Sequence, residues 1–201
     1  MNLPKPIQEF IDAFSELPSV GPRQATRLAF RLIRQGPSTI NRLAKSAALL
    51  GKIKVCSRCF FIHDQEGPLC DICTHTKREH DIFLIVEKET DLMSIERSSA
   101  YQGRYLVIGE APKSGVLEPW QVMRLSVLKK TIQDTLPSQK AREIIIGTNP
   151  STYSDAMGTR IKQELQSHTE KITFLGRGIP TGGEIEFSDE ETLSHALHRR
   201  Q

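Results

Sequence analysis

Residues 81–87 read DIFLIVE, and this stretch decides the fold. Its five central residues are all apolar, which is typical of a strand buried on both faces of a parallel sheet. Three later stretches have the same texture: GRYLVIG (103–109), REIIIGT (142–148) and KITFLG (171–176). Helical patterns near residues 89–98, 118–133 and 155–167 separate the four strands. This alternation of strand and helix predicts a layered α/β fold with a parallel sheet.

The chain after the fourth strand is rich in glycine and then polar. GRGIPTGG (176–183) precedes EIEF (184–187), and a helical pattern follows to about Arg199. These features predict a tight loop, a short strand and a helix capped by Ser188. GRGIPTGG lacks the spacing of a dinucleotide site, so we interpret it as a structural or interface loop. GEAPKSG (109–115) has proline where a phosphate-binding loop needs glycine, so it predicts no nucleotide site.

The segment before the sheet, residues 5–54, is helical in pattern. Apolar residues recur at i, i+3, i+4 and i+7, as on one helix face: Ile7, Phe10, Ile11 and Phe14. LPSVGP (17–22) breaks this first helix, and a second helix is predicted over 23–34. A third helix, capped by Ser38 or Thr39, completes the segment.

Charge is distributed unevenly along the chain. Residues 1–55 hold nine Lys or Arg and three Asp or Glu, a balance of +6, whereas the remainder has a balance of −3. A basic N-terminal third on a near-neutral body indicates a surface for a polyanion. The alternative interpretation is an ordinary solvated helical surface.

The overall composition narrows the class of protein. Hydrophobic residues make up 38% of the chain and charged residues 25%, as in globular proteins. The sequence has no run of 18 apolar residues, which excludes a transmembrane helix and a membrane partner. Its N-terminus lacks the layout of a secretory signal, so we expect a cytoplasmic location.

All four cysteines fall in the motif Cys56-x2-Cys59-x10-Cys70-x2-Cys73. Two Cys-x2-Cys pairs on short hairpins, called knuckles, place four thiolates tetrahedrally around one Zn²⁺. Because no coordination position stays open, the zinc is predicted to be structural. Two disulfides are disfavoured in a reducing cytosol, and a redox pair needs no second knuckle. Three histidines lie nearby: His63, His75 and His80. Because four thiolates saturate the ion, we predict that these are exposed loop residues.

The stretch LPSVGPRQATRLA (17–29) resembles a helix-hairpin-helix element, a non-specific DNA-binding unit. A tight hairpin aims backbone N–H groups and the helix dipole at a phosphate. Arg23 and Arg27, one turn apart, are predicted to flank that phosphate without reading the base sequence. Ser19 stands where the usual hairpin has its first glycine. The alternative is a plain helical turn with surface arginines.

DIFLIVE ends in Glu87, at the carboxyl end of a strand, where open α/β sheets place their sites. An acid there, followed by a helix with Asp91, resembles a Toprim domain. In catalytic Toprim domains this glutamate works with an Asp-x-Asp pair to hold Mg²⁺. Here the matching strand runs into Thr148-Asn149-Pro150, and Asp155 is the only acid nearby. We therefore predict a Toprim scaffold without catalytic machinery, in which Glu87 either supports the next helix or faces a partner.

The order of these parts resembles the RecR family of bacterial recombination mediators over essentially all 201 residues. The matching segments are LPSVGPRQATRLAF (17–30), the cysteine cluster, IVEKETDLMSIERS (85–98), YQGRYLVIG (101–109), GTNPS (147–151) and GIPTGGEIEFSDEETL (178–193). The resemblance implies a non-enzymatic DNA-repair factor that forms ring-like tetramers, clamps DNA, and acts with RecO and RecF to load RecA.

The resemblance also assigns roles to residues of this chain. Arg23 and Arg27 would contact DNA, and Glu87 and Asp91 would form part of a surface facing RecO. The implied zinc ligands are Cys56, Cys59, Cys70 and Cys73.

The predicted fold class is therefore α/β with four parts. These are a helix-hairpin-helix region (1–54), a four-cysteine zinc finger (55–76), a Toprim-like parallel domain (80–176) and a strand-helix tail (177–201). Two rival functions remain open. One is a Mg²⁺-dependent nuclease or primase-like enzyme, against which the missing Asp-x-Asp counts. The other is a zinc-ribbon RNA-binding module, against which the hairpin counts.

Overall fold

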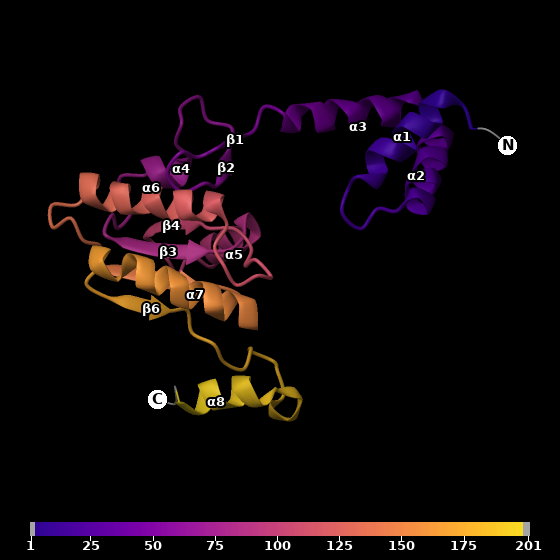
Figure 1. Cartoon of the computed structure of the whole chain (residues 1–201). Coiled ribbons are helices and arrows are strands. Elements are labelled where there is room, and N and C mark those ends of the chain that lie inside the picture. Colours follow the sequence, from indigo (N-terminus) through magenta and orange to yellow (C-terminus); the bar gives the residue numbers. More distant parts are fainter. Residues whose placement is uncertain (1–2, 199–201) are drawn as a thin grey trace. The chain divides into compact units, whose positions relative to one another are not determined.

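The structure is a computed structural model that describes residues 3–198. Its chain divides into two compact units, one ending at Ile53 and the other beginning at Lys54. We call the first the helical unit and the second the sheet unit; Figure 1 labels the elements of both. No helix among the described residues is both long and apolar enough to cross a membrane.

Between Leu3 and Ile53 the chain forms three helices: α1 (Lys5–Ser15), α2 (Pro22–Gln35) and α3 (Pro37–Leu50). This confirms the predicted helical region. Helix α1 packs on α2, and α2 packs on α3. The buried residues of the unit are few: Ile11, Ala25 and Ala29. Helix α3 buries none of its own residues, so most of the apolar surface of this unit faces outward.

The junction between α2 and α3 differs from the prediction. Gly36 has φ +87°, a left-handed conformation that glycine adopts without strain, and its N–H donates to the carbonyl oxygens of Leu32 and Ile33. Helix α3 then begins at Pro37, whose fixed φ suits a first helical position. Gly36 is therefore the N-cap, and the predicted cap at Ser38 or Thr39 is wrong.

Four parallel strands form the main sheet among the described residues, in the order β4-β3-β5-β6. They are β3 (Ile82–Val86), β4 (Arg104–Val107), β5 (Glu143–Gly147) and β6 (Ile172–Phe174). Leu84 pairs in register with Tyr105 on one side and with Ile145 on the other. The central strand is almost wholly buried, as the apolar run in DIFLIVE predicts.

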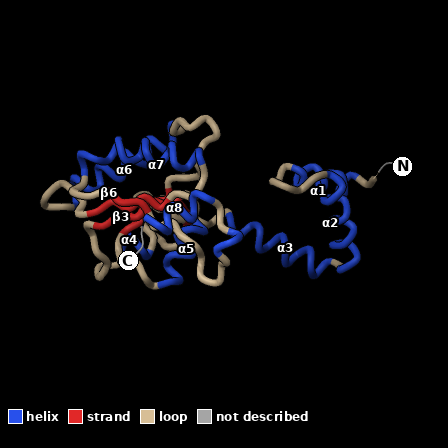
Figure 2. The backbone as a smooth tube through the Cα atoms, turned by 90° about the horizontal axis from the view of Figure 1, so that it is seen from below, coloured by secondary structure: helices blue, strands red, loops and turns tan. Residues whose placement is uncertain are grey.

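Helices cover both faces of this sheet. Helix α5 (Glu89–Ser98) lies on one face, and α6 (Pro119–Thr135) and α7 (Thr152–Leu165) lie on the other (Figure 2). This division follows from topology: the connection through α5 runs from β3 to β4, and those through α6 and α7 run the other way along the sheet, from β4 to β5 and from β5 to β6. Right-handed crossovers that run in opposite directions place their helices on opposite faces. The strand order therefore reverses at β3, and the crevice between the ends of β3 and β5 is where such sheets place ligands.

A small cysteine-bearing module precedes the sheet. It consists of the antiparallel pair β1 (Lys54–Val55) and β2 (Ile62–His63) and the short helix α4 (Asp71–Thr74). The carbonyl oxygen of Cys59 accepts a hydrogen bond from the N–H of Val107 at 2.8 Å, and Phe60 joins the main core. The module thus covers the open edge of β4, which would otherwise present unpaired backbone groups.

The tail contains a 3-10 turn, η2 (Ile185–Phe187), and helix α8 (Glu190–His198). The predicted strand at 184–187 is wrong: no neighbouring strand pairs with it among the described residues, and the N–H of Ser188 closes the turn onto the carbonyl of Ile185 instead. Asp189, not Ser188, caps α8, since its carboxylate accepts from the N–H of Thr192 at 2.8 Å. The predicted helix end at Arg199 lies outside the described residues.

Candidate nucleic-acid interface and metal centre

Helix α2 carries four arginines on its exposed surface: Arg23, Arg27, Arg31 and Arg34. They line one hollow of about 710 Å³, together with Phe30. None of the four forms an ion pair with any described residue. Sequence reasoning singled out only Arg23 and Arg27. The spacing of three or four residues along one helix was the signal that extends the same face to Arg31 and Arg34.

Most arginines of the sheet unit are, by contrast, held by acids or rings. The ion pairs are Arg78–Glu96, Arg142–Glu79, Arg142–Asp81, Arg160–Glu164 and Arg177–Asp155. Arg124 lies 4.8 Å from the ring centres of Phe60 and Trp120 and donates to the carbonyl of Val107. Among the described residues, the arginines that are exposed and have no ion-pair partner are therefore concentrated on α2.

The hairpin before α2 is tight, as the sequence predicts. Ser19 has φ +65°, a left-handed conformation, and the N–H of Val20 donates to the carbonyl of Leu17 at 3.1 Å. Gly21 is the N-cap, and its carbonyl accepts from the N–H of Ala25 at 3.0 Å. The left-handed backbone explains why glycine is usual at position 19 of such hairpins. Arg23 thus lies in the first turn of α2, where the helix dipole favours an anion.

The four cysteines lie together in the sheet unit. All are buried and free, and their sulfur atoms lie within 4.8 Å of one another. A tetrahedral site with metal–sulfur bonds of about 2.3 Å requires sulfur–sulfur distances of about 3.8 Å. The Sγ atoms of Cys59 and Cys70 are 3.4 Å apart, close to that requirement. The cluster could therefore hold one metal ion.

Backbone groups and burial complete this centre. The N–H of Cys70 donates to the Sγ of Cys56 at 3.4 Å, and Cys70 immediately precedes α4, which carries Cys73. The pKa of the Cys59 thiol is raised, first by its hydrogen bond to Cys56, then by the other two sulfur atoms and by burial. A bound dication opposes that effect by stabilising the thiolates.

The histidines near the cluster behave differently from one another. His75 is exposed, as predicted, and His80 is half-buried. The prediction of an exposed loop residue is wrong for His63: it is buried on β2, and neither of its ring nitrogens has a hydrogen-bond partner among the described residues. The two-residue strand turns its side chain inward, which a motif-based reading of the sequence does not detect.

Glu87 and Asp91 lie at the carboxyl edge of the sheet. Glu87 is only 4% exposed, and its Oε1 accepts a hydrogen bond from the N–H of Asn149 at 2.7 Å. The Oδ2 of Asp91 accepts from the N–H of Lys88 at 2.9 Å and so caps α5. The structure thus gives Glu87 a structural bond across the crevice between β3 and β5. Both acids also line a shallow hollow of about 370 Å³ that Glu110 shares.

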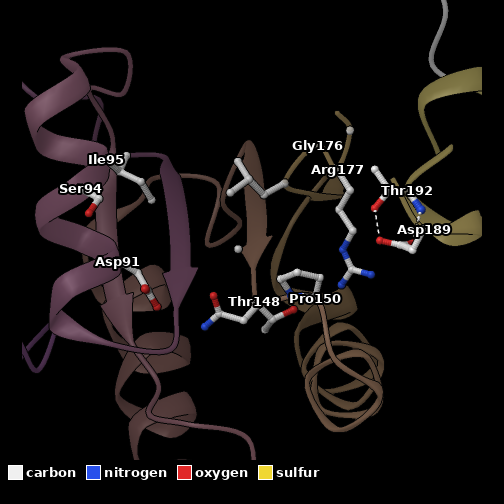
Figure 3. Close-up of a pocket in the computed structure, with 13 residues that line it drawn as sticks. Asp91, Ser94, Ile95, Thr148, Pro150, Gly176, Arg177, Asp189 and Thr192 are labelled. Atoms are coloured by element: carbon white, nitrogen blue, oxygen red, sulfur yellow. Dashed lines mark hydrogen bonds between the residues drawn. The ribbon is translucent and has the colours of Figure 1, made fainter. Parts of the chain in front are cut away.

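A larger cavity of about 580 Å³ lies beside this crevice. Figure 3 shows Asp91 on one side, Arg177 on the other, and Thr148 and Pro150 between them. The loop predicted to be structural, GRGIPTGG, contributes Gly176, Arg177 and Gly178 to its wall. Arg177 pairs with Asp155, so the one acid that follows β5 is already neutralised.

These features define a class of protein: a helix-hairpin-helix unit joined in sequence to a four-cysteine module and a parallel α/β sheet. The family model described as "RecR, helix-hairpin-helix" matches residues 7–48, and the model described as "RecR, C-terminal" matches residues 178–201.

Relatives described as "Recombination protein RecR" match nearly the whole chain. The protein from Roseiflexus sp. (strain RS-1) is 34% identical over 201 residues, 99% of this chain and 95% of the relative. The protein from Rubrobacter xylanophilus is 36% identical over 97% of this chain and 96% of its own length. The protein from Mycolicibacterium smegmatis is 36% identical over 98% and 97%. The chain therefore belongs to the RecR family.

Proposed function

We propose that this protein is a non-enzymatic DNA-binding recombination mediator of the RecFOR type. The observation that carries the proposal is the face of α2, where four exposed arginines without acidic partners follow a tight hairpin. This segment lies within the region matched by the helix-hairpin-helix family model. The RecR relatives are described as recombination proteins, which supports a role in recombinational DNA repair.

The arginines suit a DNA backbone rather than a base sequence. Residues four apart on a helix are separated by about 6 Å along its axis, so the side chains of Arg23 and Arg27 reach one phosphate or two successive ones. A guanidinium forms paired, charge-assisted hydrogen bonds with phosphate oxygens. Such contacts fix the protein on DNA without specifying its sequence. Binding is therefore sequence-independent in this proposal.

The metal in the four-cysteine centre is Zn²⁺ in this proposal. Four thiolates in tetrahedral range are the donor set of structural zinc, and a closed set leaves no position for a reacting water. The ion supplies folding energy when bound. The cysteine-bearing module covers the edge of β4. By holding this module in its folded form, zinc also stabilises that edge of the sheet.

The bonds that engage the acidic side chains at the carboxyl edge of the sheet disfavour phosphoryl transfer. A two-metal site needs carboxylates that are free to bind the ions. Here Glu87 is engaged by the N–H of Asn149, Asp155 is paired with Arg177, and no acid occupies positions 148–150. These features support a Toprim-like scaffold that has no catalytic role, and count against the nuclease or primase alternative.

The partners follow from the surfaces of each unit. The hollow lined by Glu87, Asp91 and Glu110 also holds Lys88, which pairs with Glu110 at 3.0 Å, so its acids remain in excess. This excess suits a basic partner surface, which we assign to RecO, with RecF as a further partner. Exposed apolar side chains of the helical unit suit self-association: Leu17, Ile33, Leu43 and Leu50. A homotetrameric clamp that loads RecA at the nucleoid, in the cytoplasm, accounts for both surfaces.

The test is duplex binding by an α2 variant. Arg23→Ala/Arg27→Ala is compared with wild type on two labelled duplexes of unrelated sequence. We expect the variant to lose affinity for both duplexes by the same factor, roughly tenfold or more. The matched control is Lys130→Ala/Lys162→Ala, which removes two exposed charges from helices of the sheet unit and should bind as wild type. Unchanged affinity in the α2 variant, or Mg²⁺-dependent cleavage of DNA that is lost in Glu87→Ala, would refute the proposal.

A further inference from the structure

Two arginines belong to the elements that hold the four-cysteine cluster: Arg58 is in the first Cys-x2-Cys motif, and Arg104 is on β4, the strand that bonds to the carbonyl of Cys59. Arg104 is the first residue of β4 and is only 8% exposed, yet its buried Nη1 has no hydrogen-bond partner among the described residues. Arg58 sits between Cys56 and Cys59, and its Nη1 donates to the carbonyl oxygen of Cys73 at 3.3 Å. Neither arginine forms an ion pair with a described carboxylate.

This arrangement is costly unless an anion lies nearby. A buried charge without a partner strongly destabilises a folded protein, because its loss of hydration is not offset by attraction to an opposite charge. The pKa of Arg104 is lowered, first by burial and then by repulsion from Arg58, while Cys73 opposes both effects. Arg104 therefore lies within electrostatic range of both Arg58 and a cysteine of the cluster. The group that compensates it must be anionic and must lie on the side of the cysteines.

A zinc ion held by four thiolates meets that requirement. Four thiolates carry four negative charges and Zn²⁺ carries two positive ones, so the filled centre has a net charge of −2. Two guanidinium groups supply +2. The charges of the filled centre and of the two arginines therefore balance, whereas the arginines alone repel each other.

We propose that Arg58 and Arg104 are the counter-charges of the zinc centre, which stabilise its anionic thiolate cluster by their positive charge. The Nη1 of Arg104 is buried and has no hydrogen-bond partner among the described residues, so in this proposal the charge of the filled centre is what compensates it. The proposal rests on the assignment of zinc to the four cysteines. It makes both arginines positioning residues for the metal ligands, not ligands themselves.

The two arginines differ in expected importance. Outer groups that support metal ligands typically contribute 10- to 100-fold in metal affinity. Arg104 is buried at the edge of the sheet, and Arg58 is half-buried on the knuckle, where water screens its charge. Loss of Arg104 should therefore lie near the upper end of that range, and loss of Arg58 near the lower end.

The test measures zinc affinity of the full chain by competition with a chromophoric chelator, with zinc as the only added metal. Arg104→Met keeps the length of the side chain and removes its charge; we expect binding weaker by roughly 100-fold. Arg58→Met should bind roughly tenfold more weakly. Arg104→Lys should recover much of the loss, which repair of packing alone does not explain. Arg97→Met is the matched control, because Arg97 is exposed and bonds only to Ser94, and should bind as wild type.

The outcomes separate this proposal from the one on which it rests. If wild type itself binds no zinc, the zinc assignment fails. If wild type binds zinc tightly and Arg104→Met binds equally tightly, the assignment stands and the counter-charge proposal is refuted. If Arg104→Met is insoluble, the zinc affinities of Arg58→Met and Arg104→Lys still test the proposal. Zinc binding by Arg58→Met as tight as that of wild type would refute the role of Arg58 as a counter-charge.

Discussion

The helical unit and the sheet unit differ in how many of their residues are buried and in how many of their arginines have acidic or aromatic partners. In the sheet unit, strands β3 and β4 are buried almost throughout, and most arginines are paired with acids or aromatic rings. In the helical unit, α3 buries no residue, large apolar side chains are exposed, and the four arginines of α2 have no ion-pair partner among the described residues.

This difference indicates a division of labour. A unit with a large buried core and mostly paired arginines serves as a scaffold, whereas a unit that buries few residues and leaves the arginines of one helix exposed and unpaired is suited to contacts with other molecules. Exposed arginines suit a polyanion, and exposed apolar side chains suit a protein surface. The comparison can be tested by variants that should act on one unit and leave the other unchanged.

The largest expected effect is loss of the metal centre. Cys59→Ala removes one of four ligands and should release the metal from the sheet unit. Because metal binding is coupled to folding and contributes about 10 kcal/mol or more in small zinc modules, we expect a large fall in thermal stability. Metal analysis and thermal unfolding measure both effects. A variant that retains one metal per chain and melts as wild type does would contradict this expectation.

The next effect compares one leucine from each unit. Leu106 on β4 is fully buried, and Leu43 on α3 is 43% exposed. Leu106→Ala should lower the free energy of unfolding by about 2–5 kcal/mol. Leu43→Ala should lower it by about 1 kcal/mol, because a large part of the removed surface is already in water. Chemical denaturation at low protein concentration measures both free energies of unfolding. A larger loss in Leu43→Ala than in Leu106→Ala would contradict the difference between the two units.

A smaller effect concerns the hairpin of the helical unit. Ser19 is held at φ +65°, where a Cβ atom is disfavoured. Ser19→Gly should raise the free energy of unfolding by about 0.5–1 kcal/mol, net of the greater freedom that glycine has in the unfolded chain. Ser38→Gly, in the first turn of α3, is the control and should destabilise. If Ser19→Gly is as destabilising as the control, the left-handed backbone carries no strain.

Much of the fold could be predicted because the relevant signals are local. Apolar runs such as residues 82–86 identify buried strands, and the spacing of the cysteines identifies a cluster that could hold a metal ion, without knowledge of distant contacts. The hairpin before α2 could be found for the same reason, since turns depend on a few adjacent residues.

The errors came from features that depend on neighbours in space. EIEF has the composition of a strand but has no strand beside it, so it forms a 3-10 turn. His63 is buried by packing that its own segment does not reveal. The bond between Glu87 and the N–H of Asn149 joins two loops 62 residues apart, and the burial of the Arg104 guanidinium likewise arises from the fold.

The salt dependence of duplex binding tests the central claim most directly, which is that α2 binds DNA through its arginines. Each phosphate contact adds about 0.9 to the slope of log K against log salt concentration. We expect Arg23→Ala/Arg27→Ala to lower this slope by about two for each α2 helix engaged on DNA, and Lys130→Ala/Lys162→Ala to leave it unchanged. An unchanged slope in the α2 variant, with the fold and metal content intact, would show that the arginines of the helical unit do not contact DNA.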